Sequence, residues 1–459
     1  MGTRIRQVGG FFLGGVSIFS GTQAFAAEFQ LSSSPVVTGT EVTLRAEGGV
    51  EGAIYALFVD TEKGDYYLPG GVWLGLGMSP HFSLMDNGQF GRDGIFETKT
   101  FLPEDDALIG AVFFVQGLML ELSSFRFSTT NRLDIVVRGP STGILCSAEE
   151  IARLPTSGSA WQRVKSEADK ATGTPDLSNQ DDDVNVRVLA KALVFARTGD
   201  EKYRSDVIKA CMDAMWTEKG GRTLALAREL GAYVVAADMV GLPPAEDAKF
   251  RDWIRACLTE VLDGKTLIST HEDRPNNWGT HAGGARAAVA AYLGDEKELA
   301  RCAQVFKGWL GDRSSYAGFA YGDLSWQADP KNPVGINPKG STRDGHSIDG
   351  VLPDDQRRAG GFKWPPPKEN YVYEGLQGVL LQAIILDRSG YDVWNWQDKA
   401  ILRAFTWLEE QANFNADGDD TWQPHVVNHF YAENFPAPEV SSPGKNIGWT
   451  CWLYGTADQ

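Results

Sequence analysis

Motifs that bind metals are missing from this chain of 459 residues. It contains no CxxC pair and no HExxH sequence, so we expect neither a metal ion nor another cofactor. The cysteines are few, odd in number and far apart, which favours buried thiols over a disulfide framework and leaves open one bridge at most. They are Cys146, Cys211, Cys257, Cys302 and Cys451.

Excess positive charge and long apolar runs are missing as well. The formal net charge is −17, which disfavours non-specific binding to nucleic acid or to an anionic membrane. No apolar run after the N-terminus is long enough to span a bilayer. Residues 1–27 have the pattern of a signal peptide: two arginines, a short apolar stretch and small residues at the cleavage end. We therefore expect a secreted or periplasmic protein.

Residues 28–138 are predicted to form an all-β domain. Short runs rich in β-branched and aromatic residues, such as 42–46, 53–59 and 110–115, are separated by Gly, Asp, Asn and Pro. This pattern indicates an immunoglobulin-like sandwich. It contains no catalytic constellation, so we expect a structural role, with polymer binding as the alternative.

Residues 145–459 are predicted to be all-α. A linker at 139–143 is followed by about ten amphipathic segments, among them 277–293 and 296–310. No tight repeat period recurs, which favours an (α/α) toroid over a solenoid. A Gly-, Pro- and Trp-rich stretch at about 317–370 is expected to form the wall of a binding cleft. Between residues 339 and 368 it carries six cations against four carboxylates, which suits an anionic ligand.

The stretch Arg274–His281 is expected to open a helix. Pro275 suits the turn before a helix or its first residue, and Asn276 or Asn277 can cap the helix. Amide and imidazole side chains thus gather where the helix dipole and unpaired N–H groups favour an anion. The alternative is a capped helix with a buried Trp278.

Three motifs follow one another in a characteristic order: Asn276-Asn277 at a helix start, Asp349-Gly-Val-Leu-Pro353 with Arg358 five residues further on, and Tyr371 at the start of a helix. In this order the chain resembles the alginate lyase superfamily of polysaccharide lyases over roughly residues 145–430. The resemblance implies an (α/α) toroid that cleaves polyuronates by β-elimination, with Asn277, Arg358 and Tyr371 in catalytic positions. Trp278 stands where mannuronate-specific members have histidine, so the chain looks closer to the glucuronan (cellouronate) and polymannuronate lyase branch.

Elimination removes the C5 proton beside a carboxylate and expels the O4 glycoside, so neutral or cationic donors must hold that carboxylate. Asn277 and Arg358 can do so, and Tyr371 can serve as base and acid. The catalytic imidazole is either His346, in the loop before the Arg motif, or His281, on the helix face of Asn277; His271, His425 and His429 are further candidates. Expected substrate-binding residues are Asn276, Trp278, Arg274, Arg343, Arg357, Trp364, Gln180 and Tyr373, the last also an alternative to Tyr371.

The sequence therefore predicts an exported lyase that cuts a β-1,4-linked, anionic polysaccharide and leaves 4,5-unsaturated uronate ends. Two other functions stay open. A glycoside hydrolase on the same toroid would use two carboxylates from the set Asp349, Asp354, Asp355 and Glu374. A non-catalytic protein would only bind the polysaccharide.

Overall fold

The computed structural model describes residues 29–33, 36, 41–68, 71–103, 105, 108, 111–137, 143–440 and 442–455. The predicted signal peptide and most of the predicted linker lie outside these residues. Contacts divide the described chain into two compact units. Residues within Met1–Ser33, Thr43–Lys99 and Phe113–Asp134 form the β unit, and those within Ser34–Val42, Thr100–Val112 and Ile135–Gln459 form the helical unit.

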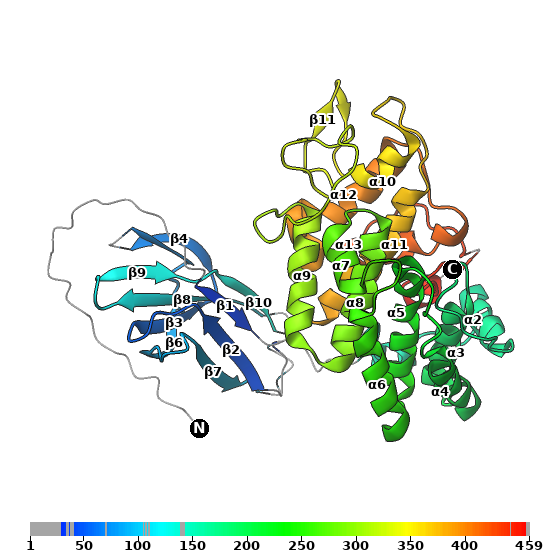
Figure 1. Cartoon of the computed structure of the whole chain (residues 1–459), viewed down its shortest axis with the longest axis horizontal. Coiled ribbons are helices and arrows are strands. Elements are labelled where there is room, and N and C mark those ends of the chain that lie inside the picture. The colour runs from blue at the N-terminus through cyan, green and yellow to red at the C-terminus, as the bar shows by residue number, and fades with distance from the viewer. Residues whose placement is uncertain are drawn as a thin grey trace. The chain divides into compact units, whose positions relative to one another are not determined.

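The N-terminal part is mostly β-sheet and the C-terminal part mostly helical, as predicted (Figure 1). The two predicted boundaries, the immunoglobulin-like sandwich and the toroid stay predictions. No helix in the described part of the chain is long and apolar enough to cross a membrane. All five cysteines are free, which confirms the expectation of thiols.

Antiparallel strands build the N-terminal part. They are β1 (Gln30–Ser33), β2 (Glu41–Glu47), β3 (Ile54–Asp60), β4 (Lys63–Leu68), β5 (Val72–Leu76), β6 (Ser83–Gln89), β7 (Phe96–Phe101), β8 (Val112–Glu121), β9 (Arg126–Thr129) and β10 (Leu133–Val136). One sheet has the order β1-β2-β7, a second has the order β10-β8-β3-β6 with β9 also paired to β8, and β4 and β5 form a hairpin. Side-chain alternation fixes the faces: in β2 only Val42, Leu44 and Ala46 are buried.

The helical unit contains α1 (Ala148–Arg153), α2 (Ser159–Asp169), α3 (Val184–Thr198), α4 (Glu201–Ala214), α5 (Thr223–Val240), α6 (Pro244–Thr259), α7 (Leu267–Asp273), α8 (Asn277–Leu293) and α9 (Glu296–Leu310). After the long interruption come α11 (Tyr371–Arg388), η3 (Val393–Asn395), α12 (Trp396–Glu410), η4 (Gly418–Asp420), α13 (Gln423–Tyr431) and α14 (Thr450–Leu453).

Helix α8 is the central helix of this unit. It is rich in alanine and glycine and is buried on nearly all sides, because α11 and α5 pack against it along much of its length. Gly378 of α11 permits the close approach, since a Cβ there would come within 2.3 Å of the His281 backbone nitrogen. The small side chains of α8 therefore serve helix packing.

The interruption between α9 and α11 is ordered although it holds little regular structure. It contains the two-residue strands β11 (Thr342–Arg343) and β12 (His346–Ser347), helix α10 (Pro353–Gln356) and η2 (Arg357–Ala359). Trp326, Ile336 and Ile348 are buried. The Asn337 side chain replaces a strand ladder, donating to the Trp326 carbonyl at 2.9 Å and accepting from the Ala328 N–H at 3.0 Å.

Candidate active site

The N-terminus of α8 presents a buried amide. Asn276 caps the helix by accepting a hydrogen bond from the Trp278 N–H at 3.2 Å. Asn277 is fully buried, and its backbone N–H donates to Asp355 Oδ1 at 3.0 Å. The Asn277 side-chain oxygen and nitrogen have no partner among the described residues. A buried amide with unused donors and acceptors is costly in a folded protein, so this position fits a ligand-binding role.

His281 lies one turn further along α8, on the face of Asn277. Its side chain is fully buried, and Nε2 lies 3.7 Å from Glu374 Oε2 of α11, just beyond hydrogen-bond distance. Burial lowers the pKa of His281, and the neighbouring Glu374 only partly offsets this effect. The imidazole is therefore neutral and can donate a hydrogen bond or accept a proton.

Glu374 is ionised and held by an arginine. It forms an ion pair with Arg228 of α5, whose side chain is almost fully buried. Burial alone would raise the pKa of Glu374, but His281 and Arg228 outweigh it and lower that pKa to about 2. Asn446, between α13 and α14, is also fully buried with both ends of its amide unpartnered in the described structure.

Helices α8 and α11 run parallel, so their N-termini lie together. Three contacts establish the direction: Gly283 with Gln382, Thr280 and His281 with Gly378, and Asp355, which bonds Asn277, with Gly375. Tyr371, the first residue of α11, therefore lies at the same end of the helix pair as Asn277.

Tyr371 is an accessible phenol beside a cation. It is 38 % exposed, and Arg358 lies over its ring with Cζ 4.0 Å from the ring centroid. Glu374 follows Tyr371 by three residues, which puts both on one face of α11. The predicted catalytic residues Asn277, His281, Arg358 and Tyr371 thus belong to two contact groups at one end of the α8–α11 pair.

His346 belongs to a different group. Its ring stacks on Trp364, with centroids 4.3 Å apart and an angle of 6° between the planes. Arg343, opposite His346 in the β11–β12 pair, donates to the Gln327 carbonyl at 3.2 Å and lies over Phe362. Within the described residues no contact joins His346 to Asn277, His281 or Glu374.

Some predicted substrate-binding residues have other partners. Tyr373 is buried and its hydroxyl donates to the Phe414 carbonyl at 2.7 Å, so neither the base role nor substrate contact fits it. Arg357 is paired with Asp354, at 2.8 Å from Nε to Oδ1. Arg274 lies over the half-buried ring of Trp278. The backbone carbonyl of Gln180 lies 3.5 Å from Arg228 Nη1, so Gln180 contacts this arginine through its main chain.

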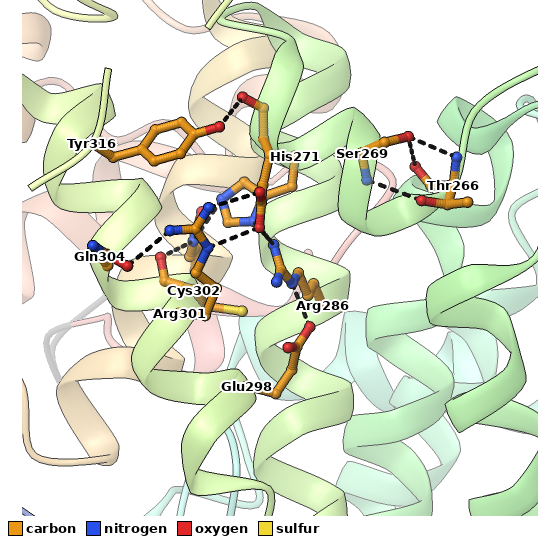
Figure 2. A network of polar contacts seen from close by, with 11 residues as sticks. Thr266, Ser269, His271, Arg286, Glu298, Arg301, Cys302, Gln304 and Tyr316 are labelled. Atoms are coloured by element: carbon orange, nitrogen blue, oxygen red, sulfur yellow. Dashed lines mark hydrogen bonds and ion pairs between the residues drawn. The ribbon is translucent and has the colours of Figure 1, made fainter. Parts of the chain in front are cut away.

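His271 is a structural histidine. It is buried between Arg286, at 3.3 Å from Nδ1, and Gln382, at 3.3 Å from Nε2. Figure 2 shows the surrounding network. Arg286 forms ion pairs with Glu272 and Glu298, and Arg301 donates to the two carboxylate oxygens of Glu272 through two of its nitrogens. These pairs tie α7, α8 and α9 together and fix the turn that leads to Asn277. His425 bonds the Pro438 carbonyl, and His429 packs on Phe430 and Tyr454.

Sequence reasoning missed Arg228 and Asn446, and it considered Glu374 only as a possible hydrolytic carboxylate. A signal for Arg228 exists, because Arg228-Glu229 interrupts an otherwise apolar helix. Charged residues in such a position are almost never fully buried unless paired. The neighbouring Glu229 is fully buried with both carboxylate oxygens unpartnered among the described residues.

Comparison with known proteins supports the class of polysaccharide lyases. Residues 161–317 match the family model described as alginate lyase. The matched segment contains Arg228, Asn277 and His281 and ends before Arg358 and Tyr371. This match supports the relationship to the alginate lyase superfamily that the motifs indicated. No curated protein matches the chain.

Solved structures are similar only at low identity. An alginate lyase from Bacteroides ovatus is 12 % identical, with a TM-score of 0.45 over 70 % of this chain and 100 % of that one. Salmonella alpha-2-macroglobulin reacted with methylamine is 12 % identical, with a TM-score of 0.25 over 95 % of this chain and 27 % of that one. A beta-1,2-glucanase from Parabacteroides distasonis is 8 % identical, with a TM-score of 0.18 over 78 % and 54 %.

Proposed function

We propose that the protein is an exported polysaccharide lyase that cleaves glucuronan or polymannuronate by β-elimination. The observation that carries this proposal is the parallel packing of α8 and α11. It gathers the unpartnered Asn277 amide, the neutral His281 and the accessible Tyr371–Arg358 pair at one end of two helices. We further propose that these helices belong to an (α/α) toroid and that residues 1–27 are removed on export.

The Asn277 amide would neutralise the substrate carboxylate. The C5 proton becomes acidic only if the negative charge that develops on the carboxylate during its removal is stabilised by fixed donors. Asn277 lies at a helix N-terminus, where the dipole adds to this effect, and its side-chain donors are unused. His281, neutral and one turn away, is placed to donate a second hydrogen bond.

Tyr371 would remove the C5 proton and return a proton to O4. In β-1,4-linked D-mannuronate or D-glucuronate both groups leave from the same side of the ring, so one phenol suffices. Arg358, stacked on the Tyr371 ring, places a positive charge beside the proposed base. Of the two candidate imidazoles, the structure favours His281, because His346 contacts Trp364 and has no described contact with Asn277.

Glu374 and Arg228 would position the imidazole. A carboxylate beside one ring nitrogen orients the ring and selects its tautomer, as in other carboxylate–histidine pairs. Arg228 keeps Glu374 ionised at the low dielectric of this site. The stacked His346 and Trp364, with Arg343 close by, would form the more distant wall along which the polymer lies.

Three of the four carboxylates of the hydrolase alternative are paired with arginines, and only Asp355 keeps one buried oxygen without a partner in the described structure. Asp349 bonds Arg403, Asp354 bonds Arg357, Asp355 accepts from the Asn277 N–H, and Glu374 pairs with Arg228. A hydrolase needs two carboxylates that face the scissile bond, one of them as acid. These contacts favour elimination over hydrolysis.

The proposal is tested by ultraviolet absorbance of the purified protein with glucuronan, polymannuronate and polyguluronate. Elimination creates a double bond conjugated to the carboxylate, and we expect the absorbance to rise with glucuronan or polymannuronate. Tyr371→Phe should lower the rate by roughly 100-fold or more, since it removes the base. New reducing ends without absorbance would indicate a hydrolase, and polymer binding without any product would indicate a binding protein.

Tyr373→Phe is the matched control. Both substitutions remove one hydroxyl from the same turn of α11, but the Tyr373 hydroxyl bonds the Phe414 carbonyl in the core. We expect Tyr373→Phe to keep the elimination rate and to lower the free energy of unfolding by about 1 kcal/mol. The opposite pattern, with activity lost in Tyr373→Phe alone, would contradict the assignment of Tyr371.

A further inference from the structure

The β4–β5 hairpin displays two aromatic side chains to solvent. Tyr67 of β4 and Trp73 of β5 are directly opposite each other in the antiparallel register. Their rings meet edge to face, with centroids 4.9 Å apart. Tyr67 is 56 % exposed and Trp73 is 59 % exposed. Exposed apolar surface that is gathered in one patch, and not scattered singly, is a candidate binding site.

The strand that carries Trp73 is held rigidly. The Thr129 hydroxyl donates to the Trp73 carbonyl at 3.3 Å. Two residues further on, the Gly75 N–H donates to Gln116 Oε1 at 2.7 Å and the Gly75 carbonyl accepts from Arg132 Nη1 at 3.0 Å. Because β5 is fixed by side chains from β8 and from the segment after β9, the aromatic pair is preorganised for a ligand.

A guanidinium lies on the same face as Trp73. Side chains two residues apart in a strand point to one face, so a side chain at position 75 would point as Trp73 does. A Cβ at Gly75 would lie 3.0 Å from Arg132 Nη1, which shows that Arg132 occupies this face where the glycine leaves room. Arg132 and Lys63 both pair with the carboxylate of Asp134.

We propose that the Tyr67–Trp73 pair and Arg132 form a binding site for an anionic polysaccharide, separate from the catalytic residues. The C–H faces of a sugar ring carry partial positive charge and stack on the negative face of an aromatic ring. A carboxylate on that sugar ring or the next would meet Arg132. The choice of a uronate polymer rests on the proposed function, whereas stacking and binding do not depend on cleavage.

The size of the pair argues against a second protein as the ligand. An aromatic side chain buries about 150–250 Å², so two of them supply less than the roughly 800 Å² that each partner contributes to a stable interface. A polysaccharide chain is narrow enough to be held by two rings and one cation. The site would raise the local concentration of substrate at the enzyme.

Native electrophoresis of the full chain through gels that contain polyglucuronate tests the proposal. A Tyr371→Phe background keeps the polymer intact. We expect the polymer to retard the protein, and Trp73→Ala to weaken the apparent affinity by roughly threefold to tenfold. Tyr66→Ala is the matched control. Tyr66 is 49 % exposed and lies on β4 next to Tyr67, but its side chain points to the opposite face. The Tyr66→Ala variant should migrate like the parent.

Two comparison polymers separate the contributions. Hydroxyethylcellulose has the sugar rings without charge, and polyacrylate has the charge without rings; both should retard the protein less than polyglucuronate. In active protein, Trp73→Ala should raise KM for the long polymer and leave kcat on a short oligosaccharide unchanged.

Equal retardation of Trp73→Ala and its parent would overturn the proposal, as would an equal response to polyacrylate. A concentration-dependent mass that Trp73→Ala abolishes would overturn it in favour of self-association. If the protein with Tyr371 intact gave no ultraviolet signal, while the retardation in the gel still depended on Trp73, the lyase proposal would be refuted and the proposal for this binding site would stand.

Discussion

Asn277 combines full burial with an amide that has no partner in the described structure. We predict that Asn277→Ala lowers kcat/KM for elimination by roughly 100-fold, as removal of a preorganised donor does. Its thermal unfolding midpoint should stay the same or rise, because no hydrogen bond is lost. Elimination rate and thermal unfolding measure the two effects.

Asn276→Ala provides the contrasting case. Asn276 caps α8 through the Trp278 N–H, so its loss should cost about 1 kcal/mol of stability. If Asn277→Ala instead destabilised the protein and left the rate unchanged, the amide would be a structural group and the proposed site would be wrong.

Glu229 is a fully buried carboxyl with no partner in the described structure. Burial raises its pKa to about 10, and Asp182 adds to the shift. The folded pKa lies above the unfolded value near 4.5, so the stability that this carboxyl contributes is present below pH 4.5 and is lost as the pH rises towards 10. Glu229→Gln should therefore raise the unfolding midpoint at pH 7 and have no effect near pH 4.

Glu374→Gln should show the opposite sign at pH 7. It removes the charge that pairs with the nearly buried Arg228, and an uncompensated buried cation is strongly destabilising. Thermal melts of both variants at the two pH values make the comparison. A Glu229→Gln variant that is less stable at pH 7 would mean that Glu229 is ionised and paired in solution.

At the scale of the element, the contact between α8 and α11 depends on glycine. A Cβ at Gly378 would lie 2.3 Å from the His281 nitrogen, and backbone cannot move aside as a side chain can. We predict that Gly378→Ala destabilises the protein by about 1–3 kcal/mol and reduces elimination, since a shift of α11 moves Glu374 away from His281. Chemical denaturation and the ultraviolet assay measure both effects.

Gly231→Ala on α5 is the matched control. Its Cβ would meet only a methyl group of Leu381, at 2.9 Å, which can rotate away. We expect a small change in stability and normal activity. Equal effects of the two substitutions would show that helix composition, and not the close approach, is responsible.

Sequence patterns predicted the strongly periodic helices well. The segments 277–293 and 296–310 coincide with α8 and α9. Helix α7 was not predicted, because it has only seven residues and its capping box uses Ser269 in place of an acidic residue. Short helices of this kind are stabilised by tertiary contacts, here the arginine network around Glu272.

The same limit applies to the site. Asn277 and His281 could be grouped from the sequence because they are four residues apart on one helix. Arg228 and Glu374 are 146 residues apart in the chain, and only the packing of α5 and α11 beside α8 brings them together. Tyr373 was kept as an alternative to Tyr371, and only the structure shows that its hydroxyl points into the core and bonds the Phe414 carbonyl.

For the whole molecule, buried histidines predict sensitivity to acid. Burial lowers the pKa of His271, with Arg286 and Arg301 adding to the effect, and burial also lowers the pKa of His281. The folded pKa of each imidazole lies below the unfolded value of 6.5. The stability that the two imidazoles contribute is therefore fully present above pH 6.5 and is lost as the pH falls below it. Glu374, with a folded pKa of about 2, adds a further loss below pH 4.5.

We therefore predict that the two imidazoles cause a decline of the urea midpoint below about pH 6.5, while Glu229 acts in the opposite direction between pH 4.5 and 10. His271→Gln should flatten the first part of this decline, because glutamine cannot take up a proton. Parallel curves of midpoint against pH for His271→Gln and its parent between about pH 7 and 5 would contradict the buried, neutral state of His271.

The free, buried thiols can report how often the helical unit opens. Every cysteine lies in the helical unit, and Cys211, Cys257 and Cys302 have no exposed surface. Burial also raises the pKa of Cys302 to about 12, which suppresses the reactive thiolate. A labelling reagent can therefore reach these sulfurs only while the helices are apart, so its incorporation counts the opening events of the helical unit and is silent about the β unit.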